Sequence, residues 1–181
     1  YDLGGGTFDI AILQKVENGF ELIGRPDGID RLGGVDFDQA IFAHVAGTVE
    51  LNLGPLSETD AGRTALWRLR EECREAKEAL SADTEAVIPV LLPGMQTEVR
   101  ITRAEFENMI RPRIAETVQA MQRAAASAGR ELGEIDRVLL VGGSSRIPLV
   151  GQAVAAATGA RVMVDAHPKH AVALGAARTA L

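Results

Sequence analysis

Three consecutive glycines, Gly4 to Gly6, separate Asp2-Leu3 from a stretch that alternates apolar and polar residues over residues 7–16. Alternation with a period of two is typical of a β-strand with one buried face. A glycine triplet removes every side chain from the segment before that strand, so we expect a turn whose backbone amides a ligand can approach closely. Because Asn18-Gly19 then returns the chain into residues 20–24, the pattern predicts a β-hairpin.

Strands and helices alternate along the rest of the chain, which has 181 residues. A loop is expected over residues 25–34, and Pro112 is expected to stop or kink the helix in which it lies. Helices are predicted to begin at Asp36, Ser57, Thr102, Pro148 and Pro168, and strands at residues 86–92, 97–101, 137–141 and 161–164. With 46% hydrophobic but only 4% aromatic residues and 19 glycines, this order predicts an α/β fold.

Charge and cysteine content exclude several classes of function. The net charge of −6 gives no reason to expect a nucleic acid or an anionic membrane as partner. No apolar run approaches the roughly 18 residues that a bilayer span needs. The single cysteine, Cys73, excludes an internal disulfide framework, and we expect its side chain to be buried packing material.

The glycine turn carries chemistry suited to phosphate. Its bare amides can contact phosphate oxygens, Thr7 adds a hydroxyl, and Asp2 and Asp9 can hold a hydrated magnesium ion. A permissive hairpin with acidic flanks explains the same residues equally well, so the turn alone does not decide between the two interpretations.

A second glycine turn follows the strand predicted at residues 137–141. Gly142 and Gly143 lead through Ser144 to Arg146, just before the helix expected at Pro148. A strand, a glycine turn and a helix N-terminus favour a bound phosphate, and the guanidinium adds a planar fork of donors. An ordinary strand-to-helix connection has the same form.

The long helix predicted from Ser57 offers a third element. Its inward row is spaced three and four residues apart and consists of Leu66, Leu69, Cys73, Ala76 and Leu80. Lys77 and Ser81 lie one turn apart on an adjoining face and could meet a ribose or phosphate together. A solvated charged face is the ordinary explanation of such a lysine.

Five motifs, in one order, resemble the DnaK-like seventy-kilodalton heat-shock chaperones over essentially the whole chain. They are YDLGGGTFD at residues 1–9, RLGGVDFD at 31–38, AK and LS within 76–81, VGGSSRIP at 141–148 and AVALGAA at 171–177. The resemblance implies the actin-like ATPase (ribonuclease H-like) fold, and within it the second lobe, lobe II. Residues 1–39 and 111–181 would form a core with a five-stranded mixed sheet, and residues 40–110 an inserted α+β upper subdomain.

The resemblance also implies roles for individual residues toward ATP or ADP with Mg²⁺. The implied nucleotide-binding residues are Asp2, Gly4, Gly5, Gly6, Thr7, Asp9, Lys77, Ser81, Gly142, Gly143, Ser144 and Arg146. Asp2 and Asp9 would orient magnesium-bound water, whereas Lys77 and Ser81 would reach the adenosine. The catalytic groups of the family belong to the first lobe, so the parent is expected to hydrolyse ATP and this lobe alone to catalyse little.

This chain departs from the family pattern around the base. Arg74 and Glu78 replace residues of different charge and, lying four apart, could pair with each other. Lys169 and His170 replace the acidic end of an Asn-Pro-Asp-Glu motif, and their effect on nucleotide affinity is open. His167 and His170 beside a proline are expected to be surface residues rather than metal ligands.

The implied partners are the first lobe of the same ATPase domain, a substrate-binding domain and, through the parent, unfolded polypeptides. Nucleotide-exchange and J-domain co-chaperones are further candidates. The chain begins without Met, so we expect a missing N-terminus. A cytoplasmic location is expected because the single cysteine agrees with a reducing compartment. Three alternatives stay open: an actin-like cytoskeletal ATPase, a small-molecule kinase of the same superfamily and a divergent regulatory relative.

Overall fold

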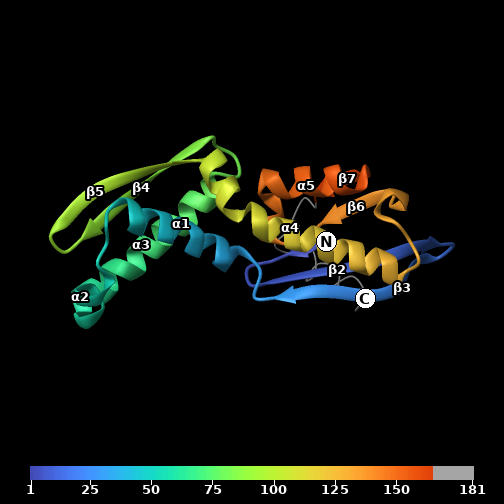
Figure 1. Ribbon diagram of the computed structural model, residues 1–181, viewed down its shortest axis with the longest axis horizontal. Coiled ribbons are helices and arrows are strands. Elements are labelled where there is room, and N and C mark those ends of the chain that lie inside the picture. The colour runs from blue at the N-terminus through green and yellow to red at the C-terminus, as the bar shows by residue number, and fades with distance from the viewer. Residues whose placement is uncertain (165–181) are drawn as a thin grey trace. The chain divides into compact units, whose positions relative to one another are not determined.

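The computed structural model describes residues 1–164, which form two compact units (Figure 1). Unit 1 consists of Tyr1–Val35 and the chain from Arg111 onward, and unit 2 consists of Asp36–Ile110. The helix predicted at Pro168, the residues His167, Lys169 and His170 and the motif at residues 171–177 lie outside the described residues. No helix within residues 1–164 is long and apolar enough to cross a membrane.

Unit 1 begins with three antiparallel strands: β1 (Asp2–Leu3), β2 (Thr7–Val16) and β3 (Gly19–Asp30). The hairpin predicted from the glycine triplet and Asn18-Gly19 is confirmed. The prediction of a loop over residues 25–34 was wrong for residues 25–30. These residues belong to β3, which ends where Asp30 pairs with Thr7. The pairing of β2 with β3 shifts in register between Ile10 and Ile12, and this irregularity accommodates the greater length of β3.

Two parallel strands complete the sheet of unit 1. Strand β6 (Arg137–Leu140) pairs with β7 (Arg161–Val164), as predicted, and between them lie the short 3-10 turn η2 (Gly143–Arg146) and the helix α5 (Pro148–Thr158). A parallel bridge between Asp2 and Val141 joins β1 to the end of β6, and the amide of Leu3 donates to the carbonyl of Val141 at 3.0 Å. The strand order is therefore β3-β2-β1-β6-β7, which is the five-stranded mixed sheet that the resemblance implied.

Helix α4 (Arg103–Ser127) begins in unit 2, ends in unit 1 and stays helical through Pro112. The helix starts as predicted at Thr102, through a capping box in which the amide of Thr102 donates to Glu105 Oε2 at 2.8 Å and the amide of Glu105 donates to Thr102 Oγ1 at 3.2 Å. Of the two outcomes expected at Pro112, a stop or a kink, the stop was wrong because the helix continues through this residue. Proline removes one backbone donor, and the apolar face of a helix of 25 residues is buried on both sides of it, at Ile110 and Ile114.

Unit 2 consists of α1 (from Gly34 to Thr48), α2 (Leu53–Glu58), α3 (Asp60–Ala79) and the hairpin of β4 (Glu85–Leu92) and β5 (Met95–Thr102). Figure 1 shows this hairpin beside α3. The predicted row of Leu66, Leu69, Cys73, Ala76 and Leu80 is buried, which confirms the helix face.

The starts of two helices in unit 2 differ from the predictions. Helix α1 begins before Asp36, which lies in its first turn. Helix α3 is capped by Thr59, whose Oγ1 accepts from the amide of Gly62 at 3.1 Å, whereas Ser57 lies in α2 and donates to the carbonyl of Leu53. Threonine and serine both favour the cap position, so the choice between them depends on the backbone at the α2–α3 junction.

Candidate functional site

The glycine turn between β1 and β2 contains two exposed residues whose backbone amides have no hydrogen-bond acceptor within residues 1–164. Gly5 and Gly6 are exposed, and a Cβ built on either would meet nothing within 4 Å. The turn is closed by the amide of Gly4, which donates to the carbonyl of Thr7 at 3.1 Å. Within residues 1–164 the amides of Gly5 and Gly6 donate no hydrogen bond, so they can take an anionic oxygen without breaking an existing contact.

The start of α1 supports this turn through backbone contacts. The amide of Gly34 donates to the carbonyl of Gly4 at 3.0 Å, and that of Val35 donates to the carbonyl of Gly5 at 2.8 Å. A Cβ on Gly33 would lie 2.6 Å from Gly5 C and Gly6 N. Gly33 therefore permits the close approach that fixes the turn, a role that its place in the motif at residues 31–38 did not indicate.

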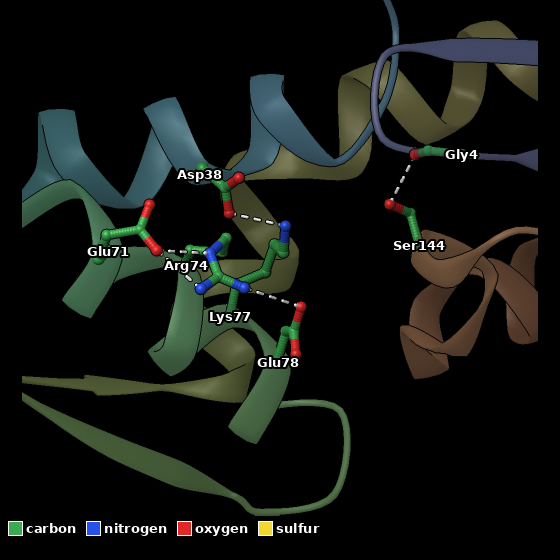
Figure 2. Close-up of polar contacts among 7 residues, drawn as sticks. All are labelled: Gly4, Asp38, Glu71, Arg74, Lys77, Glu78 and Ser144. Carbon is green, nitrogen blue, oxygen red and sulfur yellow. Dashed lines mark hydrogen bonds and ion pairs between the residues drawn. The ribbon is translucent and has the colours of Figure 1, made fainter. Parts of the chain in front are cut away.

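The second glycine turn lies directly against the first. Ser144 Oγ donates to the carbonyl of Gly4 at 2.8 Å, the contact drawn in Figure 2. Gly142 has φ 85° and ψ 148°, a conformation essentially restricted to glycine, and a Cβ there would lie 2.3 Å from the carbonyl oxygen of Leu3. The structure thus brings together two turns that are far apart in the sequence.

The residues from Gly143 to Arg146 form η2, which was not predicted and which separates Gly142 from α5. Ser145 Oγ donates to the carbonyl of Val141 at 2.5 Å, so this buried hydroxyl closes the turn on itself. Arg146 ends η2 with an exposed side chain. Its guanidinium is available to a ligand, as the sequence indicated.

Asp2 and Asp9 are cross-strand partners on β1 and β2. Such partners project from the same face of a sheet, and the neighbouring pair of Leu3 and Phe8 is buried on the other face. Burial raises the pKa of Asp2 above its ordinary value, and the nearby carboxylate of Asp9 raises it further.

Two carboxylates suit a magnesium ion only when phosphate supplies further oxygens. The described residues contain no group of three or more His, Cys, Asp or Glu placed to hold a metal. Magnesium keeps several waters and is commonly bound by one or two carboxylates together with substrate phosphates. Asp2 and Asp9, beside the open amides of Gly5 and Gly6, fit that arrangement.

Lys77 and Ser81 belong to unit 2. Lys77 Nζ lies 2.7 Å from Asp38 Oδ1, which joins α3 to α1 (Figure 2). The lysine side chain is only 11% exposed, so it is a buried, charge-compensated residue rather than part of a solvated face. Asp38 lies in the motif at residues 31–38, yet nothing in the sequence indicated this partner. Ser81 is half-buried just after α3.

Arg74 is held by two carboxylates of its own helix. Its Nη2 lies 2.7 Å from Glu71 Oε2, and its Nη1 lies 3.6 Å from Glu78 Oε1 (Figure 2). The pairing with Glu78 that the spacing allowed is thus present, but the shorter contact is to Glu71. The charges of these residues are compensated along α3 itself.

The comparison with known families decides the classification. The family model described as Hsp70 protein matches residues 1–181, the whole chain. The chain belongs to the Hsp70 family. Hsp70 proteins are chaperone ATPases with the actin-like fold, to which the mixed sheet of unit 1 conforms. Membership implies nucleotide binding, typically with Mg²⁺, and polypeptide partners in general.

Proposed function

We propose that this chain is lobe II of an Hsp70 ATPase domain and holds the phosphates of ATP or ADP on its first glycine turn. One observation carries the proposal: Gly5 and Gly6 are exposed, a Cβ on either meets nothing within 4 Å, and their amides donate no hydrogen bond within the described chain. The hydrogen bond from Ser144 to the carbonyl of Gly4 and the close packing of Gly33 against the turn hold its backbone in place. Hydrogen-bond donors that are already in position stabilise a bound phosphate without a free-energy cost for reorganising the protein.

The other residues take complementary roles in this proposal. Thr7 adds a hydroxyl beside the amides, and Asp2 and Asp9 hold waters of a magnesium ion whose charge neutralises the phosphates. The second turn forms the floor of the nucleotide site and contacts the adenine base. Its contacting residues are Gly142, Gly143, Ser144 and Arg146. Lys77 and Ser81 contact the adenosine from unit 2.

Coupling to protein substrates is part of the proposal, because membership of the Hsp70 family supports polypeptide partners in general. A nucleotide that binds one conformation of the parent protein more tightly than another shifts its conformational equilibrium, and in the parent that shift would reach a substrate-binding domain. Phosphoryl transfer depends mainly on positioning and charge stabilisation, and we place the missing catalytic groups in the first lobe.

Nucleotide titration with matched glycine variants tests the proposal. Gly6→Ala adds a methyl group to the exposed glycine turn, where it would compete with a bound phosphate for space, whereas Gly47→Ala adds the same methyl to an exposed site on α1; neither Cβ meets anything within 4 Å. Losing a hydrogen bond to a charged group costs about 1.5 to 3 kcal/mol, so Gly6→Ala should weaken Mg·ATP and Mg·ADP binding about 10- to 150-fold. Gly47→Ala should bind like the wild type.

The titration is followed by ³¹P NMR, which detects weak binding at millimolar nucleotide, and thermal unfolding confirms that both variants fold. Equal phosphate shifts in the wild type and Gly6→Ala would remove the glycine turn from the site. No phosphate shift in the wild type at any accessible concentration would remove the nucleotide-binding function from this chain on its own.

A further inference from the structure

The turn after α3 is held by a side chain that has no role in the proposed site. Residues 80–84 connect α3 to β4, and Ser81 lies among them. The amide of Ser81 donates to the carbonyl of Glu78 at 3.2 Å. The last carbonyls of a helix have no partner inside the helix, and here two carbonyls of the turn accept from another element of unit 2.

Arg103, the first residue of α4, supplies the donors. Its Nε donates to the carbonyl of Leu80 at 2.8 Å and to that of Asp83 at 3.1 Å, and its Nη2 donates to the carbonyl of Asp83 at 2.8 Å. The amide of Arg103 also donates to the carbonyl of Thr84 at 2.8 Å. This half-buried residue therefore holds the backbone on both sides of Ser81.

The contact depends on the shape of the arginine side chain. A guanidinium is a planar fork of N–H donors, so it can bond two carbonyls at once, whereas a lysine ammonium is a compact point charge on a flexible stem. A positive charge is also favourable at the C-terminal end of α3, where the helix dipole is negative. Replacing Arg103 by lysine would therefore keep the charge and lose the geometry.

The side chain of Ser81 is in a different situation from the backbone around it. Its hydroxyl donates no hydrogen bond within residues 1–164, and the residue is half-buried. A hydroxyl on a fixed backbone is a donor that is already in position, so a ligand can take its hydrogen bond without a free-energy cost for reorganising the turn.

We propose that Arg103 is a positioning residue for adenosine recognition. By holding the carbonyls of Leu80 and Asp83, it orients the hydroxyl of Ser81 for a hydrogen bond to the adenosine, and it does not itself touch the nucleotide. This role rests on the proposed function, in which Ser81 contacts the adenosine. Arg103 thereby contributes to recognition of the nucleoside and leaves the binding of the phosphates unaffected.

Two ligands test this role in the full chain. Mg·ADP carries the adenosine, whereas Mg·pyrophosphate presents phosphates alone, and ³¹P NMR follows the binding of both. Arg103→Lys should weaken Mg·ADP about 2- to 13-fold, the range for one neutral hydrogen bond, and leave Mg·pyrophosphate unchanged. Arg103→Gln, which also lacks the fork of donors, should have the same effect. Thermal unfolding confirms that each variant folds.

A control variant and a double-mutant cycle separate positioning from general stability. Arg100→Lys makes the same substitution on β5 of the same unit, where Arg100 Nη2 lies 2.9 Å from Glu85 Oε1 at the surface, and should bind both ligands like the wild type. Ser81→Ala should weaken Mg·ADP by a factor similar to that of Arg103→Lys. Ser81→Ala/Arg103→Lys should bind no more weakly than Ser81→Ala, because a hydroxyl that is absent cannot be positioned.

Three results would overturn the role of Arg103. They are unchanged Mg·ADP binding by Arg103→Lys, equal weakening of Mg·ADP and Mg·pyrophosphate, and independent effects that multiply in the double variant. Unchanged Mg·ADP binding by Ser81→Ala would remove Ser81 from the site, and Arg103 with it, while the glycine turn keeps its function. No phosphate shift of either ligand in the wild type would instead remove the proposed function itself.

Discussion

Replacing Gly142 by alanine tests whether the contact between the two glycine turns is as tight as the structure shows. The added Cβ would lie 2.3 Å from the carbonyl oxygen of Leu3 and 2.5 Å from its carbonyl carbon. Both are backbone atoms of β1, so no side chain can rotate away. The φ of 85° adds a conformational penalty, because a residue with a Cβ rarely adopts it.

The expected loss of stability follows from three terms. Strain in this backbone region costs about 1 to 3 kcal/mol, and forcing a methyl group into a packed site costs about 1 to 3 kcal/mol. Alanine also restricts the unfolded chain, which offsets about 0.4 to 1 kcal/mol. The net destabilisation is therefore about 1 to 6 kcal/mol, or a fall in melting temperature of roughly 2 to 24 °C for a chain of this size.

Urea unfolding followed by far-ultraviolet circular dichroism measures this loss, with Gly5→Ala as the control. Gly5 lies in the partner turn, has no positive φ and has nothing within 4 Å of its Cβ position. Its variant should stay within about 0.5 kcal/mol of the wild type. Equal stability of Gly142→Ala and Gly5→Ala would show that the second turn does not press against Leu3 in solution.

Three further predictions concern single side chains. Burial raises the pKa of the Cys73 thiol to about 12, so at pH 8 a thiol reagent should label the native chain far more slowly than the denatured chain; stoichiometric labelling within minutes would place the thiol at the surface. Burial also raises the pKa of Asp2. Protonation of Asp2 therefore stabilises the folded state at pH values below the usual carboxyl pKa, and this contribution to stability is lost as the pH rises through the raised pKa. Asp2→Asn should therefore raise the urea midpoint at pH 7 more than at pH 3, and an equal change at both would contradict this. Ser144→Ala removes the bond to the Gly4 carbonyl and should cost about 0.5 to 1.5 kcal/mol; the same change at Ser81, which donates no side-chain bond within the described residues, should cost less, and the reverse order would refute the role of Ser144.

Much of the fold follows from local patterns. The strands β4 and β5, the helix start at Thr102 and the buried row on α3 each follow from residues that are near neighbours along one element. Such patterns specify an element whatever surrounds it. Where two local solutions compete, as at Ser57 and Thr59, the sequence does not choose, because both residues can cap a helix.

The candidate site was identified in parts, and the parts were assembled only by the fold. The glycines at positions 4–6 and 142–143 indicate bare backbone, and glycine has that property in any context. The bond from Ser144 to Gly4 spans 140 residues of sequence, and the close approach of Gly33 to the first turn depends on where α1 begins. Neither contact leaves a periodicity or a spacing that could be recognised beforehand.

The sequence by itself determined the types of the elements, the buried faces of the helices and the presence of two side-chain-free turns. Only the tertiary structure decided that β3 extends to Asp30, that β1 joins two strand pairs into one sheet, and that Lys77 is neutralised by Asp38. The physical reason is the range of the interactions. Propensity, capping and amphipathic period act between near neighbours, whereas strand pairing and buried ion pairs form between segments that chain folding must first bring together.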